Sequence, residues 1–246
     1  MSDPTTLDSI TPHSRYREDF SRLAMGLDRR TALVLVVAAL CLTGQYYLAS
    51  LRWLSTWIAD PIPQSLSWCG LIVVFYLILP ALVVKFGFRQ NLKDYGLAWN
   101  GLHRHGWPYL VLLGVMLPVI IGASFNPHFK EYYPFFAYAS ASLAGFLLWE
   151  LAYGLHFVAV EFFFRGFLLF GLSERLGPYA FFISAVPYCM VHFSKPAGEA
   201  IGAILAGLAL GYLAWKNRSI WGGALVHWGV AITMDLASTL QKLPSP

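Results

Sequence analysis

The sequence predicts an all-α, polytopic membrane protein, a helical bundle of about seven transmembrane helices. Of its 246 residues, 57% are hydrophobic and only 12% are charged, about half the charged share of a typical soluble domain. A soluble chain of this size would need more charges to cover its surface, so lipid must solvate much of this one. Seven apolar runs, most of them close to the length that crosses a bilayer, give the expected number of helices.

The apolar runs define the predicted helices in order along the chain, because a transmembrane helix needs about 20 mostly apolar residues. They cover residues 32–51, 66–84, 107–124, 143–172, 178–192, 200–215 and 220–240. The fifth and sixth runs are short, so we expect these helices to be tilted, partly re-entrant or interrupted. Pro61 and Pro63 break the chain after the first run, and Pro196 and Gly198 separate the fifth run from the sixth.

This pattern divides the chain into a polar tail, residues 1–30, and a membrane domain, residues 31–246. Lys and Arg in the short connections indicate the orientation, because they accumulate on the cytoplasmic side. Of the 17 Lys and Arg residues, twelve lie in the tail and in the connections on its side of the membrane. Four lie on the opposite side, and Arg165 lies within a helix. The excess predicts a cytoplasmic N-terminal tail.

Composition also narrows the possible partners. The net charge of +4 is modest, and no basic run is interleaved with aromatic residues, so no nucleic-acid partner is expected. Cys41, Cys69 and Cys189 lie in apolar runs, and their odd number and spacing argue against a disulfide framework or a zinc knuckle. We interpret all three as small buried hydrophobic residues. The expected partner of the outer surface is the lipid bilayer.

The most informative residues are ionisable groups inside the apolar runs. A charge at the centre of a bilayer costs at least about 2.5 kcal/mol, so it must face the protein interior, be paired or take part in chemistry. These residues are Glu150, His156, Glu161, Arg165, His192, Glu199, His227 and Asp235.

Glu161 and Arg165 form the clearest pair. They are four residues apart in the fourth run, which places them on one face of a helix in the favourable order of acid before base. The pair is either structural, each charge offsetting the burial cost of the other, or part of a site. Glu150 lies three turns earlier on almost the same face, where it would line the same cavity or reach the outer interface.

Two histidines favour a site over a purely structural pair. His192 ends the fifth run and His227 lies about two turns into the seventh. A lone histidine in a membrane helix is usually a hydrogen-bonded core residue, but two of them near a carboxylate suggest proton transfer, because imidazole titrates near neutral pH. One Glu and two His can also hold zinc. Zinc proteases, however, usually carry two His four residues apart on one helix, and this sequence has no such pair. We therefore expect no metal and no other cofactor.

Three motifs in these runs resemble those of a known family. Glu161-Phe-Phe-Phe-Arg165-Gly166 resembles its first motif, E-E-x-x-x-R, and Tyr188-Cys-Met-Val-His192 resembles its second, F-x-x-x-H, with Tyr in place of Phe. His227 stands where the third motif, H-x-x-x-N, begins. The chain is thus similar to the CAAX-protease and bacteriocin-processing family of intramembrane endopeptidases, with a protease-like core at about residues 143–240.

The resemblance implies a helical bundle with its site in a cavity inside the bilayer. It implies cleavage of a membrane-anchored peptide or protein near its membrane-embedded or lipidated end, in the plasma (inner) membrane of a bacterium. The resemblance implies that a Glu activates water with the help of a His, and that a His with an Asn stabilises the oxyanion. Glu161 matches the second Glu of the first motif, so it either mainly braces Arg165 or serves as the base itself. Our hypothesis is that Glu161 activates water, Arg165 orients Glu161, His192 relays the proton and His227 donates to the oxyanion.

The sequence departs from the family pattern at two positions. The leading Glu of the first motif is replaced by Val160, and the Asn of the third motif by Ala231. Glu199, seven residues after His192, either returns to the cavity as a second catalytic carboxylate or is an interfacial acid at the start of a helix. Asp235, two turns beyond His227, either replaces the missing amide or is a charge at the outer interface.

Two other functions remain open at this level. Val160 and Ala231 motivate a non-catalytic relative, either a membrane scaffold or a bacteriocin self-immunity protein. A small transporter that uses Glu161 and Asp235 as proton sites is the third hypothesis, although the chain shows no repeated halves of the kind that many transporters have.

Overall fold

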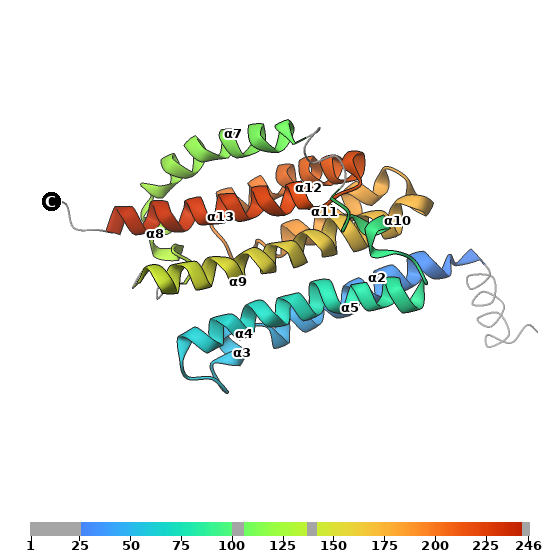
Figure 1. Ribbon diagram of the computed structural model, residues 1–246, viewed down its shortest axis with the longest axis horizontal. Coiled ribbons are helices and arrows are strands. Elements are labelled where there is room, and N and C mark those ends of the chain that lie inside the picture. The colour runs from blue at the N-terminus through green and yellow to red at the C-terminus, as the bar shows by residue number, and fades with distance from the viewer. Residues whose placement is uncertain (1–25, 100–105, 137–141, 243–246) are drawn as a thin grey trace, which may run out of the picture.

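The computed structural model describes residues 26–99, 106–136 and 142–242, and all regular elements in these ranges are helical. Residues 1–25, which make up most of the predicted cytoplasmic tail, lie outside the described residues. Figure 1 shows an elongated bundle whose long helices run roughly along one axis. The predicted all-α membrane bundle is confirmed.

The first two predicted segments pack beside each other at one side of the bundle (Figure 1). α2 (Arg29–Leu48) begins after Asp28, whose carboxylate accepts a hydrogen bond from the backbone amide of Thr31 and so caps the helix. The short helix α3 (Leu51–Leu54) leads to the second segment, Pro61–Gly87. That segment is built from α4 (Pro61–Val73), η1 (Val74–Ile78), α5 (Leu79–Leu82) and η2 (Val83–Gly87).

The third predicted segment forms the opposite side of the bundle in Figure 1. The 3-10 helix η3 (Leu92–Tyr95) lies in the connection that precedes it. α7 (Trp107–Ser124) has the bounds that the sequence predicts, and it is followed by the short helix α8 (Pro127–Tyr132). α7 packs chiefly along α13 (Trp221–Lys242), so most of its surface faces outward.

The fourth segment is the central helix of the bundle. It runs without interruption through α9 (Leu143–Glu161), η5 (Phe162–Leu168) and α10 (Leu169–Leu176). In its most apolar stretch 89% of the residues are buried, compared with 17% for α2. η5 is a π-helix, whose amides bond to the carbonyl five residues back instead of four, a conformation that is frequent at functional sites.

The last three segments complete the packing around this central helix. α11 (Tyr179–Met190) lies against α12 (Ala197–Asn217), and both contact η5. α13 lies between α7 and α9 (Figure 1). The three motif-bearing segments, η5 with the end of α9, α11 and α13, are therefore neighbours in space although they are far apart in the sequence.

All seven predicted segments are helical, but they differ in their suitability for crossing a membrane. Five helices in the described ranges are long and apolar enough: Arg29–Leu48, Pro61–Gly87, Trp107–Ser124, Leu143–Leu176 and Ala197–Asn217. The fifth predicted segment is the shorter apolar helix α11, as its short run suggests. α13 has 22 residues, but its polar side chains lower its mean hydropathy, so it is not among the five.

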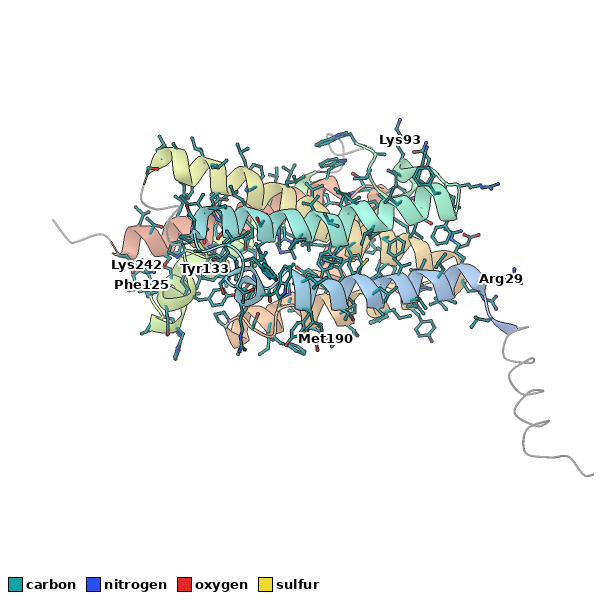
Figure 2. The ribbon with its side chains drawn as sticks, turned by 90° about the horizontal axis from the view of Figure 1, so that it is seen from below. Arg29, Lys93, Phe125, Tyr133, Met190 and Lys242 are labelled. Atoms are coloured by element: carbon teal, nitrogen blue, oxygen red, sulfur yellow. The ribbon has the colours of Figure 1, made fainter. Side chains whose placement is uncertain are left out.

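The bundle has two ends along its long axis (Figure 2). Arg29 and Lys93 lie toward one end, and Phe125 and Lys242 lie toward the other. Met190, the last residue of α11, lies between these ends. The second motif therefore stops part-way along the bundle, away from both ends.

A close backbone contact fixes η5 against the connection that contains η3. Gly166 of η5 faces the backbone carbonyl of Tyr95, and a Cβ atom at this glycine would lie 2.7 Å from that oxygen and 2.9 Å from the ring of Phe162. Real Cβ atoms do not approach other atoms this closely, so only glycine permits the contact. The contact holds the π-helix that carries Arg165.

We predict that Gly166→Ala lowers the free energy of unfolding by about 1–3 kcal/mol, because the added methyl group overpacks the contact with Tyr95. Thermal unfolding of the purified protein in detergent measures this change. Gly202→Ala is the matched control, because a Cβ atom at Gly202 meets nothing within 4 Å. Equal melting temperatures for Gly166→Ala and the wild type would contradict the prediction.

Candidate active site

The site is built around the carboxylate of Glu161, the last residue of α9. Its side chain is completely buried, and so is that of Arg165, one turn later in η5. Nη1 of Arg165 lies 3.0 Å from Oε1 of Glu161, as the spacing of four residues predicts. The two opposite charges offset each other, which permits both to be buried inside the bundle.

His227 of α13 contacts the same carboxylate oxygen. Its Nδ1 lies 3.2 Å from Oε1 of Glu161. A carboxylate can only accept a hydrogen bond, so Nδ1 carries the hydrogen and Nε2 of the neutral ring is the free acceptor. Gly223, one turn earlier in α13, makes this approach possible, because a Cβ atom there would lie 2.5 Å from Oε2 of Glu161.

Tyr188 of α11 connects the groups of all three motifs. Its hydroxyl lies 3.4 Å from Nε2 of His227, and the guanidinium carbon of Arg165 lies 3.8 Å from the centre of its ring. Its backbone carbonyl accepts a hydrogen bond of 2.7 Å from Nδ1 of His192. The sequence showed Tyr188 only as a substitution for Phe and did not indicate that its hydroxyl would join the site.

The two imidazole rings face each other across this cluster. The ring centres of His192 and His227 are 6.5 Å apart, and the ring planes are nearly parallel, at 11°. Because Nδ1 of His192 donates to the carbonyl of Tyr188, its Nε2 is available to exchange a proton. Glu161, Arg165, Tyr188, His192 and His227 together form the Glu161 cluster, with contributions from three separate segments.

One oxygen of this cluster has no hydrogen-bond partner among the residues that the structure describes. Oε1 of Glu161 is held by Arg165 and His227, but Oε2 is buried and makes no hydrogen bond to any residue in the described ranges. A buried carboxylate oxygen without a partner is costly, so it is well suited to accept a hydrogen from a water molecule or a substrate. The arrangement therefore gives Glu161 one oxygen held by two side chains and one oxygen without a hydrogen-bond partner among the described residues.

A comparison with protein families finds a match in the second half of the chain. Residues 142–233 match the family described as "Rce1-like: Type II CAAX prenyl endopeptidase Rce1-like". This segment is similar to that family. The matched range contains the whole Glu161 cluster, and the match confirms the resemblance that the three motifs showed. No curated protein and no solved structure matches the chain.

The two positions at which the sequence departs from the family motifs carry apolar side chains in apolar surroundings. Val160 is buried in the central core beside the phenylalanines of η5. Ala231 is buried in an aromatic cluster with Trp149, Tyr153 and Phe157. Neither position offers a polar group to the Glu161 cluster.

The structure places Glu199 with other partners. Its Oε1 lies 2.5 Å from Nζ of Lys195, and its Oε2 accepts a hydrogen bond of 2.7 Å from the hydroxyl of Tyr133. α12 begins only after the turn at Pro196, so Glu199 does not continue the helix that carries His192. The structure does not join this carboxylate to Glu161, contrary to the expectation that it returns to the same cavity.

Asp235 is also engaged elsewhere. Its carboxylate accepts hydrogen bonds from the backbone amide of Phe135, at 3.0 Å, and from the indole of Trp149, at 3.3 Å. It lies eight residues beyond His227 in α13, a distance of about 12 Å along a helix. The expectation that it replaces the missing amide of the third motif is not supported by these contacts, which tie α13 to the segment after α8 and to α9.

The other two ionisable residues predicted in α9 also have contacts outside the Glu161 cluster. Glu150 is buried and accepts a hydrogen bond of 3.2 Å from the indole of Trp228, so it neither contacts Glu161 nor lies at an exposed interface. His156 is stacked on Trp68, with ring centres 4.7 Å apart. Both contacts join α9 to neighbouring helices.

The described residues contain no group of three His, Cys, Asp or Glu side chains close enough to hold a metal ion together. Glu161 and His227 are in contact, but His192 turns its Nδ1 toward the carbonyl of Tyr188. The described residues therefore contain no preformed set of zinc ligands. The expectation that no metal takes part stays a prediction.

We predict that Arg165→Met destabilises the protein by about 3–5 kcal/mol, because it leaves the buried charge of Glu161 without its partner. The double variant Glu161→Leu/Arg165→Met recovers most of this loss, since it replaces the whole pair by apolar groups of similar volume. Chemical unfolding of the three proteins in detergent measures both effects. A single variant as stable as the wild type would show that the pair does not exist in the folded protein.

Proposed function

We propose that this protein is a glutamate-dependent intramembrane endopeptidase. Its substrate is a membrane-anchored peptide or protein, which it cleaves near the membrane-embedded or lipidated end. The observation that carries the proposal is the completely buried Glu161 carboxylate. Arg165 and His227 hold one of its oxygens, and the other has no hydrogen-bond partner in the described part of the chain. The Rce1-like match supports the same reaction class.

The proposed reaction begins with a water molecule at Oε2 of Glu161. The carboxylate accepts a proton from this water while the water oxygen bonds to the carbonyl carbon of the peptide. Arg165 and His227 keep the other carboxylate oxygen in place, which directs the free oxygen toward the water. The leaving amine then receives the proton from Glu161, with Nε2 of His192 available as a relay, and the C–N bond breaks.

The proposed setting is the plasma (inner) membrane of a bacterium, with the N-terminal tail in the cytoplasm. The positive charges on that side of the predicted topology support this orientation. The part of the chain that carries the Glu161 cluster is surrounded by apolar helices with outward-facing surfaces, which suit a substrate that arrives through the lipid. Neither a nucleic-acid partner nor a cofactor is part of the proposal.

The test uses the purified protein in liposomes with two quenched fluorescent peptides. One peptide ends in a prenylated CAAX sequence, and the other contains a single transmembrane helix. We expect the wild type to cleave at least one of them and Glu161→Gln to lose about 10²- to 10⁴-fold in rate, the usual contribution of a general base. Glu161→Asp keeps the charge opposite Arg165, so it retains the fold, but the shortened side chain misplaces the base and should also slow cleavage strongly.

Glu131→Gln is the matched control, because Glu131 is an exposed carboxylate in α8. It should cleave at the wild-type rate. Full activity of a folded Glu161→Gln protein would refute the role of Glu161 as base. Failure of the wild type to cleave either peptide would favour the non-catalytic scaffold or self-immunity protein, and proton-coupled flux in the same liposomes would favour the transporter.

A further inference from the structure

The hydroxyl of Tyr188 is a feature of this chain that the family motif does not require. The motif has Phe at this position, and a phenylalanine ring would make the same ring contact with Arg165. Tyr188 is only 2% exposed, and its hydroxyl points to Nε2 of His227 inside the Glu161 cluster. A buried hydroxyl in this place needs an explanation other than packing.

The hydrogen-bond pattern makes Tyr188 the donor at this end of His227. Nδ1 of His227 donates its hydrogen to Glu161, so Nε2 of the neutral ring is a bare acceptor. A bare nitrogen cannot donate a hydrogen bond to a negatively charged oxygen, so this hydrogen-bond pattern does not suit the expected role of His227 as the oxyanion donor. The O–H group beside it belongs to Tyr188, which keeps its proton at neutral pH in ordinary circumstances.

The same region lacks the amide that the third motif supplies in the family. That position is Ala231, which is buried among aromatic side chains and has no hydrogen to donate. Hydrolysis of a peptide bond nevertheless requires a donor for the oxygen that becomes negative when water adds to the carbonyl. Tyr188 is the neutral donor that the cluster places next to His227.

We propose that the hydroxyl of Tyr188 donates a hydrogen bond to the carbonyl oxygen of the scissile peptide and takes over the function of the missing amide. This inference rests on the proposed endopeptidase function. The separation of 3.4 Å between the hydroxyl and His227 is long for a hydrogen bond, so the hydroxyl can turn to a substrate oxygen at little cost. Arg165 above the ring makes the O–H group more polar and therefore a stronger donor.

The proposed step transfers no proton from Tyr188. The water proton goes to Glu161, the water oxygen bonds to the carbonyl carbon, and the electron pair of the C=O double bond moves to its oxygen. Tyr188 donates a hydrogen bond to this oxygen while its O–H bond stays intact. When the intermediate collapses, the electron pair re-forms the C=O bond and the amine leaves with the proton from Glu161.

Tyr188→Phe tests the proposal, because it removes the hydroxyl and keeps the ring that stacks under Arg165. We expect kcat to fall by about 10²- to 10³-fold with KM nearly unchanged, as for the loss of one oxyanion donor in other enzymes. A phosphinate peptide, whose tetrahedral phosphorus imitates the intermediate, should bind more weakly by a similar factor. If the hydroxyl had only a structural role, the fall in kcat and the loss of phosphinate affinity would not be of similar size.

Tyr76→Phe is the matched control. Tyr76 is also buried, and its hydroxyl bonds to Gln45 in the core, at 3.2 Å. This variant should keep wild-type kcat and phosphinate affinity. Melting temperatures of both variants in detergent show that the comparison concerns folded proteins.

The outcomes separate this inference from the proposed function. Wild-type kcat in Tyr188→Phe, together with an inactive Glu161→Gln, would overturn the role of Tyr188 and leave the endopeptidase intact. A raised KM with unchanged kcat would also overturn it, because the hydroxyl would then serve ground-state binding. A wild-type protein that cleaves neither peptide would overturn both proposals.

Discussion

The ionic contact between Glu161 and Arg165, completed by His227, is the constraint on which the rest of the structure depends. A charged carboxylate inside a bundle of lipid-exposed helices is costly, and it is tolerated only with partners in fixed positions. A buried ion pair adds little stability compared with apolar residues of the same volume. Its presence at the centre of the fold is therefore explained better by chemistry than by packing.

The architecture supplies these fixed positions. The central helix is the most buried element, and its π-helical segment η5 begins directly after Glu161. Two glycines allow close approach because they have no Cβ atom. Gly166 leaves room for the carbonyl of Tyr95, and Gly223 lets α13 pack against the carboxylate of Glu161. α11 ends part-way along the bundle (Figure 2), so His192 follows at a level between the two ends. These contacts place a carboxylate, a guanidinium, two imidazoles and a phenol around one point.

Much of this could be predicted from the sequence, because hydrophobicity and short-range spacing determine it. The seven helical segments follow from the lengths of the apolar runs. The pairing of Glu161 with Arg165 follows from their spacing of four residues, about one helical turn. The position of the Tyr188 hydroxyl depends on how α11 and α13 are rotated toward each other, which no local pattern encodes. Asp235 has other partners than its expected place at the missing amide would give it. Helical periodicity predicts the direction of its side chain, but the rise along the axis places it about 12 Å beyond His227.

The most direct test of this account is a distance measurement by solid-state NMR in lipid bilayers, between the carboxyl carbon of Glu161 and Nδ1 of His227. The account predicts a separation of about 4 Å, set by a hydrogen bond between the two groups, with the hydrogen on Nδ1 and a bare Nε2. A separation beyond about 6 Å, outside hydrogen-bonding range, or a His227 ring protonated only at Nε2, would contradict it.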